Sequence, residues 1–143
     1  MITIMLLTYN RYEYAEHTLK TTLENIHYSG DLSVHIADDG SPGDYVDKLK
    51  FVAGCYKHVV GVGHSITQRQ GYGANYNRAT NTVHNHSKYV LPLEDDWKLT
   101  KPLDLDPYIQ DMDDKEEWGC CRLTNVGWSF QQLAEFVGVN YRT

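Results

Sequence analysis

Three consecutive carboxylates follow a strand-like run in the stretch VLPLEDDWKL. The mostly apolar residues 90–93 lead directly into Glu94, Asp95 and Asp96, so negative charge is concentrated where a strand is expected to end. Side chains alternate along an extended chain, so Glu94 and Asp96 are expected on one side, with Asp95 turned away or bonding to nearby backbone. Two carboxylates on one side can bind Mg²⁺ or Mn²⁺, with phosphate and water completing the coordination of the ion. The alternative is a solvated turn whose acids cap the next segment; the preceding strand and a second acidic loop favour the metal.

The second acidic loop is Asp38-Asp39-Gly40-Ser41, which also follows a strand-like run. As an isolated pattern it is typical of a turn followed by a helix cap. A carboxylate in this place can also accept hydrogen bonds from a base N–H or a ribose hydroxyl. No GxGxxG follows the first strand-like run, which disfavours a dinucleotide domain and leaves a mononucleotide ligand open.

Basic residues and glycines near these loops could serve an anionic ligand. Arg11, Arg69 and Arg78 suit a diphosphate, although each alone is more often a surface arginine. Gly71 and Gly73 allow close backbone approach at the start of an expected helix, whose N-terminus favours an anion. The sequence contains no GxSxG, Walker loop or CxxC motif, so nucleophilic hydrolases, P-loop proteins and zinc fingers gain no support.

The elements that must position these residues alternate between strand and helix. Ala15, Leu19, Leu23 and Ile26 recur at helical spacing in a helix that begins at Tyr12 and is closed by Gly30. In a second helix Ser41 is the expected N-cap, Pro42 the first residue, and Asp44 an acid of the first turn; it ends near Gly54. A third helix is expected from near Gly73, a short fourth at 108–112, and one more in the final twenty residues. Strands are expected at 2–7, 32–36, 58–62, 89–93 and 118–123.

This order predicts an α/β fold with a mostly parallel sheet and helices on both faces. Loops at the carboxyl ends of such strands form the ligand crevice, so all four polar clusters could line one site. A length of 143 residues predicts a single domain, 1–143.

Composition and charge narrow the function classes. With 41% hydrophobic and 22% charged residues the chain is an ordinary globular sequence without a membrane-spanning run or a signal peptide, so the cytoplasm is the expected location. The net charge of −6 disfavours a protein whose affinity comes mainly from neutralising nucleic-acid phosphates, and leaves open a nucleic-acid acceptor bound by a local basic patch. Cys55, Cys120 and Cys121 are expected to be reduced, with at least one packed in the core.

In this order, four segments resemble the family 2 glycosyltransferases, whose nucleotide-sugar-binding domain has the GT-A fold. They are LLTYNR (6–11), IADDGS (36–41), GYGANYNRA (71–79) and LPLEDDW (91–97). The resemblance covers residues 2–100 and implies a transferase that moves a sugar from a nucleoside diphosphate to an acceptor hydroxyl. A uridine donor is the expected one because it is the commonest in the family.

The resemblance also implies roles for individual residues. Residues that would bind the nucleotide sugar are Leu7, Thr8, Tyr9, Asn10, Arg11, Asp38, Asp39, Gly71, Asn77, Glu94 and Asp95. Asp96 and Glu94 match the family's Asp-x-Asp motif, with Asp96 the direct ligand of a Mn²⁺ or Mg²⁺ ion on the diphosphate. Glu94 is one methylene longer than the usual aspartate.

The acceptor half of such enzymes normally adds about a hundred residues beyond the metal motif, whereas residues 97–143 follow Asp96 here. Residues 101–143 are therefore expected to form a shortened acceptor side, and none of their acids matches the family's catalytic base. The chain could be a minimal enzyme, need a partner or second copy for its acceptor site, or be a fragment. A non-catalytic nucleotide-sugar-binding module is the main rival. A sugar-phosphate nucleotidyltransferase is disfavoured because Thr8 to Arg11 contain no glycine.

Overall fold

A computed structural model describes residues 1–115, 117–121 and 123. The chain divides into two compact units, Met1–Asp106 and Pro107–Thr143. The first unit contains a four-stranded parallel sheet, and the prediction of an α/β fold with a mostly parallel sheet is confirmed. A single domain over 1–143 stays a prediction.

The sheet has the order β4-β3-β1-β5, with β1 at Ile2–Thr8, β3 at Leu32–Asp38, β4 at Val59–Ile66 and β5 at Tyr89–Glu94. After β1 the chain adds β3 and then β4 on one side, and only afterwards places β5 on the other side of β1. The strand order therefore reverses between β1 and β5. Such a switch point leaves a crevice at the carboxyl ends of its two strands.

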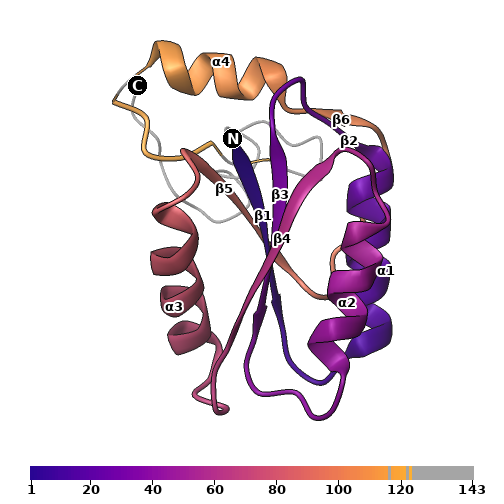
Figure 1. The fold of residues 1–143 in the computed structure, drawn as a ribbon. Helices are drawn as coiled ribbons and strands as arrows, with labels where there is room; N and C mark the ends of the chain where they lie inside the picture. Colours follow the sequence, from indigo (N-terminus) through magenta and orange to yellow (C-terminus); the bar gives the residue numbers. More distant parts are fainter. Residues whose placement is uncertain (116, 122, 124–143) are drawn as a thin grey trace, which may run out of the picture. The chain divides into compact units, whose positions relative to one another are not determined.

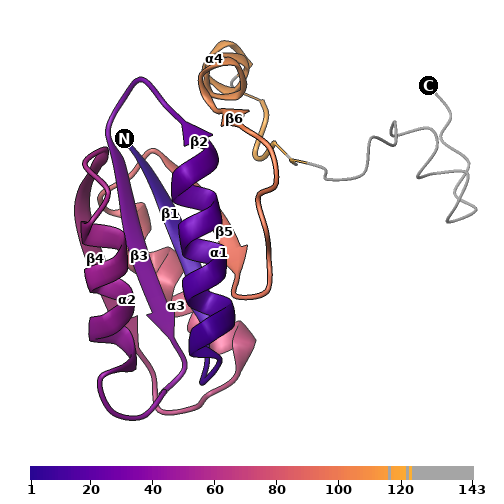
Figure 2. The same ribbon diagram turned by 90° about the vertical axis from the view of Figure 1, so that its right-hand side faces the viewer.

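Helices cover both faces of the sheet, as predicted (Figure 1). Helices α1 (Tyr12–Asn25) and α2 (Tyr45–Gly54) lie side by side on one face, and α3 (Tyr72–His84) covers the other. Figure 2 shows α1 running alongside the strands. Every residue of β1 is buried, as expected for a central strand covered on both faces.

The two sides of β1 belong to two apolar layers. Met5 and Leu7 pack with Ala37, Ala79 and Val83 beneath α3. Because side chains alternate along a strand, Ile4 and Leu6 face the layer of α1 and α2. Both are fully buried, as are Leu19 of α1 and Leu49 of α2. The two layers bury β1 on both faces, and β1 leads directly into the loop at residues 9–11.

The start predicted for the second helix is wrong. Helix α2 begins at Tyr45 and has Asp44 as its N-cap, so Ser41 is not a cap and Pro42 is not a helical residue. The Ser41 hydroxyl instead donates to the carboxylate of Asp38 and accepts from the backbone N–H of Asn10. Its hydrogen bonds join the loops after β3 and β1.

Other boundaries differ less. Helix α1 ends at Asn25, before Gly30, because the chain continues into the short β2 (Ile26–His27), which pairs with β6 (Leu103–Asp104); neither short strand was predicted. The short fourth helix is confirmed as α4 (Asp106–Asp114). The strand predicted at 118–123 is wrong for residues 118–121 and 123, which carry no strand. Residue 122 and the helix expected in the final twenty residues lie outside the described residues.

The expectation for the cysteines is partly wrong. All three are free, but Cys55 and Cys120 are exposed and Cys121 is half-buried, so none packs in the core. Among the described residues, no helix combines the length and the apolar character needed to cross a bilayer.

Candidate functional site

A pocket of about 450 Å³ lies at the carboxyl ends of β1 and β5, where the strand order reverses. The loop after β1, the turn after β5, Asp39 after β3 and the start of α3 all contribute to it. Its lining residues are Leu7, Thr8, Tyr9, Arg11, Asp39, Tyr72, Asn75, Glu94, Asp95 and Asp96. Thus each of the four polar segments singled out in the sequence contributes residues to one pocket.

The turn after β5 differs from the extended geometry predicted for it. Strand β5 ends at Glu94, and Asp95 and Asp96 form a turn, so the alternation argument does not apply to them. All three acids line the same pocket, so Asp95 does not turn away from the other two, whereas the other predicted arrangement, a bond to nearby backbone, is confirmed by the N–H of Tyr9. The turn is held from α1, because the Thr18 hydroxyl donates to the backbone carbonyls of Asp95 (2.8 Å) and Trp97 (2.6 Å).

Asp95 is the buried acid of this turn, 7% exposed. Thr8 Oγ1 donates to its Oδ2 at 3.2 Å, and the backbone N–H of Tyr9 also donates to it. Because the Thr8 hydroxyl has one proton and gives it to Asp95, the Tyr45 hydroxyl must donate to Thr8. Burial raises the pKa of Asp95 above its ordinary value, and the attraction of Arg11 only partly offsets this.

Arg11 supplies the positive charge in the pocket. Its Nη1 lies 3.1 Å from Oδ1 of Asp95, and its Nη2 lies 3.3 Å from Oδ2 of Asp96. The guanidinium also stacks over the ring of Tyr14, 4.6 Å from the centroid. The charge of Asp95 is the main cause that raises the pKa of Arg11.

The Asp38–Ser41 turn shows the opposite kind of environment. Asp38 is fully buried, and its Oδ2 accepts the backbone N–H groups of Gly40 (3.0 Å) and Ser41 (2.7 Å). Asp38 therefore shapes the turn and does not line the pocket. Gly40 has a φ of 95°, and a Cβ there would lie 3.0 Å from the carbonyl oxygen of Thr67, so the turn requires glycine.

Asp39 lines the pocket and also ties this turn to α3. Its carboxylate accepts hydrogen bonds from the Thr67 hydroxyl and from the backbone N–H groups of Gln70 and Gly71, both at 2.8 Å. Burial raises the pKa of Asp39, but these hydrogen bonds and the charge of Arg69 outweigh it, so the pKa lies below its ordinary value. The carboxylate is thus held ionised at the N-terminus of α3.

Helix α3 contributes two lining residues that the sequence reasoning missed, Tyr72 and Asn75. Asn75, Ala79 and Val83 are its buried residues and recur every four positions, which places Asn75 on the face toward the sheet. Asn75 Nδ2 donates to the carbonyl oxygen of Ala37 at 2.8 Å. The predicted Asn77 is exposed and lies outside the pocket lining. Helical spacing in the sequence could have identified Asn75.

Across the pocket, the Tyr72 hydroxyl donates to Oε1 of Glu94 at 3.2 Å. This contact joins α3 to the end of β5 and fixes the carboxylate of Glu94, which is otherwise exposed. Three other predicted residues stay outside the lining: Asn10, Asp38 and Gly71, the last being the N-cap of α3 with a φ of 89°. Arg69 stacks on Tyr9 at 5.1 Å, and Arg78 donates to the carbonyl of Ile66.

The donor set of the pocket fits a hard divalent cation. Its charged oxygen donors near the turn are Glu94, Asp95 and Asp96, and no histidine or cysteine is in the lining. The side chain of Asp96 is 47% exposed, so its oxygens are accessible. Within the described residues no three acids, histidines or cysteines are grouped so as to hold a metal by themselves. Phosphate and water would have to complete the coordination, as is usual for Mg²⁺.

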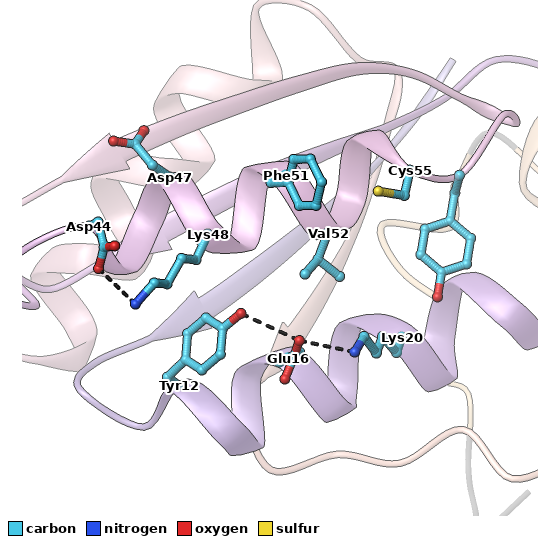
Figure 3. Close-up of a pocket in the computed structure, with 10 residues that line it drawn as sticks. Tyr12, Glu16, Lys20, Asp44, Asp47, Lys48, Phe51, Val52 and Cys55 are labelled. Atoms are coloured by element: carbon cyan, nitrogen blue, oxygen red, sulfur yellow. Dashed lines mark hydrogen bonds and ion pairs between the residues drawn. The ribbon is translucent and has the colours of Figure 1, made fainter.

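A larger groove, of about 690 Å³, lies between α1 and α2 (Figure 3). Its charged groups are paired along each helix: Lys20 with Glu16 and Lys48 with Asp44, both at 3.0 Å. Tyr12 also donates to Glu16. Because these charged groups are already paired within their own segments, the smaller pocket at the strand ends is the better candidate site.

Comparison with known proteins identifies a family. The model of the family described as glycosyl transferase family 2 matches residues 3–141. No curated protein sequence matches the chain.

Among solved structures, S. aureus TarS, its 1–349 fragment and that fragment in complex with UDP each align with a TM-score of 0.57 and 19% identity. Each alignment covers 80% of this chain and 20%, 33% and 32% of the respective TarS chains. At this identity the likeness shows the fold, and the chain spans a third or less of these structures.

Proposed function

The chain belongs to glycosyl transferase family 2, and we propose that it transfers a sugar from a nucleoside-diphosphate sugar to an acceptor hydroxyl. The observation that carries the proposal is the pocket at the β1/β5 switch point, where an acidic turn faces the loop Leu7–Arg11. A nucleotide ligand is further supported by the solved complex of TarS 1–349 with UDP. A uridine donor stays our expectation.

In this proposal the nucleotide lies against the loop after β1 and against Asp39, while its diphosphate lies over the turn Glu94–Asp96. Asp96 and Glu94 would hold a Mn²⁺ or Mg²⁺ ion, and Asp95 would keep the turn in place through Thr8 and Tyr9. When bound, such an ion stabilises the charge of the leaving nucleoside diphosphate. Arg11, at the same edge of the pocket, is placed to donate to diphosphate oxygens.

A binding module without turnover is the second candidate. It is favoured by one observation: the chain spans a third or less of the TarS structures that share its fold. Among the described residues, no acid after Asp96 lines the pocket, so the base that would deprotonate an acceptor hydroxyl is unassigned. Slow release of nucleoside diphosphate from a UDP-sugar with Mn²⁺ present supports a catalyst, whereas affinity without release supports the module.

A thermal-shift titration tests the nucleotide and metal assignment. UDP at about 100 times its Kd stabilises a single-site protein by about 2.7 kcal/mol, which raises the midpoint of thermal unfolding by several degrees. We expect a shift that needs Mn²⁺ and is lost in Asp96→Ala. The matched control is Asp47→Ala, which removes an acid whose side chain is 82% exposed, on α2, and should keep the full shift.

Two results would contradict the assignment: no shift with any nucleoside diphosphate, or a shift that Asp96→Ala retains in full. The cytoplasmic location, the acceptor and assembly with a second copy stay predictions.

A further inference from the structure

We propose that Arg11 is a built-in counter-cation that occupies the Asp95–Asp96 pair in the ligand-free chain and is displaced from it when the divalent ion binds. The displaced side chain then binds the diphosphate at the same pocket edge. The inference rests on the proposed function, because it concerns the same acidic turn. It assigns to Arg11 a positioning role in the order of binding.

Arg11 and a divalent cation compete for the same carboxylate oxygens. Arg11 Nη1 lies 3.1 Å from Oδ1 of Asp95, and Oδ2 of Asp96 lies 3.3–3.4 Å from Nη2 and Nη1. A guanidinium and a divalent cation both seek carboxylate oxygens, and two cations within a few ångströms repel each other. Arg11 must therefore release Oδ2 of Asp96 before both oxygens of that carboxylate are open to the ion that Asp96 and Glu94 would hold.

Asp95 and Asp96 differ in what holds them besides Arg11. Asp95 keeps its hydrogen bonds from Thr8 and Tyr9 whether or not Arg11 is present. The contacts of the Asp96 carboxylate within the described residues all come from Arg11. Release of Arg11 therefore frees Asp96 for the ion while Asp95 stays anchored.

The backbone of Arg11 is held by hydrogen bonds, whereas its side chain is partly exposed. Its backbone N–H donates to Tyr45 and its carbonyl accepts from Ala15, so the N-cap position of α1 is held. Its side chain is 44% exposed and rests on the face of Tyr14. The guanidinium can consequently swing without unfolding the helix, and it remains at the pocket edge, within reach of a diphosphate.

If Arg11 is displaced in this way, its removal should change the affinity for Mn²⁺ and the affinity for UDP in opposite directions, which the loss of a purely structural arginine would not do. Removing Arg11 should strengthen the binding of Mn²⁺ alone, because the competing charge is gone. The same change should weaken the binding of UDP in the presence of Mn²⁺, because a diphosphate donor is gone. Loss of a merely structural residue would weaken both.

The test measures free Mn²⁺ by electron paramagnetic resonance in titrations of four proteins: wild type, Arg11→Gln, Arg11→Lys and Lys20→Gln. We expect Arg11→Gln to bind Mn²⁺ about 3–10-fold more tightly than wild type at low salt, with a smaller difference at high salt. Arg11→Lys keeps a cation there and should stay within about twofold of wild type. Lys20→Gln is the matched control, since it removes the same charge from α1 at a side chain 46% exposed and paired with Glu16 outside the pocket.

A second titration, by calorimetry, measures UDP binding with Mn²⁺ at saturation. We expect Arg11→Gln to bind UDP about 5–20-fold more weakly, because it loses one charge-assisted contact to phosphate. Equal or weaker Mn²⁺ binding by Arg11→Gln, with a wild-type unfolding midpoint, would overturn the inference and leave the proposed function standing. If wild type binds neither Mn²⁺ nor UDP, the proposed function fails, and the inference fails with it.

Discussion

The two acidic turns of this protein look alike in sequence and differ in what neutralises them. The turn after β3 holds Asp38 and Asp39 with backbone N–H groups and hydroxyls, so their charge is distributed over local hydrogen bonds. In the turn after β5 the exposed cation Arg11 pairs with both Asp95 and Asp96; Asp95 is also held by Thr8 and Tyr9, whereas Asp96 has only Arg11 among the described residues. A carboxylate bonded by its own backbone organises a loop, whereas one paired with an exposed guanidinium can exchange its partner for a ligand.

The difference follows from position in the sheet. Strand β3 lies between β1 and β4, and the turn after it is packed against the chain that leads from β4 to α3. Strand β5 is a neighbour of β1 alone among the described strands, and its turn opens to the pocket at the switch point. The turn after β3 therefore brings one acid, Asp39, to the pocket and uses Asp38 to shape the loop, whereas the turn after β5 brings both Asp95 and Asp96 to the pocket.

Asp38→Ala should give the largest loss of stability. Asp38 is fully buried, and its removal leaves the N–H groups of Gly40 and Ser41 without their acceptor. We expect a loss of about 2–4 kcal/mol in the free energy of unfolding. Urea unfolding measures it. Asp96→Ala is the matched variant in the other turn and should change stability by less than about 0.5 kcal/mol, since it removes one exposed ion pair. Equal losses in the two variants would show that the two turns contribute alike to stability.

Gly40→Ala should have the next largest effect. The new Cβ would lie 3.0 Å from the carbonyl oxygen of Thr67 and 3.1 Å from the N of Arg69, at a φ of 95°. Both neighbours are backbone atoms of residues whose N–H groups bond to Asp38 and Asp39, so they cannot move freely. We expect a loss of about 1–3 kcal/mol in the free energy of unfolding, measured in urea.

Gly73→Ala is the control for this change. Gly73 lies in α3 with nothing within 4 Å of a built Cβ, so alanine there should stabilise the protein by about 0.5–1 kcal/mol through helix propensity. If Gly40→Ala were as harmless as Gly73→Ala, the turn after β3 would be less rigid than its hydrogen bonds indicate.

Much of this fold could be predicted from sequence because apolar periodicity and turn residues report local structure. The four main strands and the amphipathic pattern of α1 follow from alternation and from helical spacing. Ser41 was misread as a helix cap because a serine hydroxyl has several local partners. Which one it binds, here Asp38 and the N–H of Asn10, depends on a neighbouring loop that sequence spacing does not reveal.

The site shows the same limit. The sequence placed Glu94, Asp95 and Asp96 at a strand end, but their orientation depended on where β5 stops, and a strand boundary is uncertain by a residue or more. That Arg11 pairs with this turn is a contact across the β1/β5 crevice, between residues 85 positions apart. Strand order, which no local pattern encodes, brings them together.

The smallest expected effect is on the pH dependence of stability, to which Asp39 and Asp95 should contribute with opposite signs. Urea unfolding in metal-free buffer measures it. The pKa of Asp39 lies below its ordinary value of 3.8, so the folded state prefers the ionised form. The stability from that form is complete above 3.8 and is lost as pH falls through the folded pKa. The cost of Asp39→Asn should therefore shrink as the buffer is made more acidic through this range.

Asp95 should behave in the opposite way, because burial raises its pKa above 3.8 and the folded state prefers the protonated form. Its contribution is complete below 3.8 and is lost as pH rises through the folded pKa, so Asp95→Asn should cost least at neutral pH. Wild type, Asp39→Asn and Asp95→Asn are compared at each pH. The stability costs of Asp39→Asn and Asp95→Asn could instead change with pH in the same direction. Arg11 would then fully offset the burial of Asp95, and the two turns would differ in the partners of their acids but not in electrostatic environment.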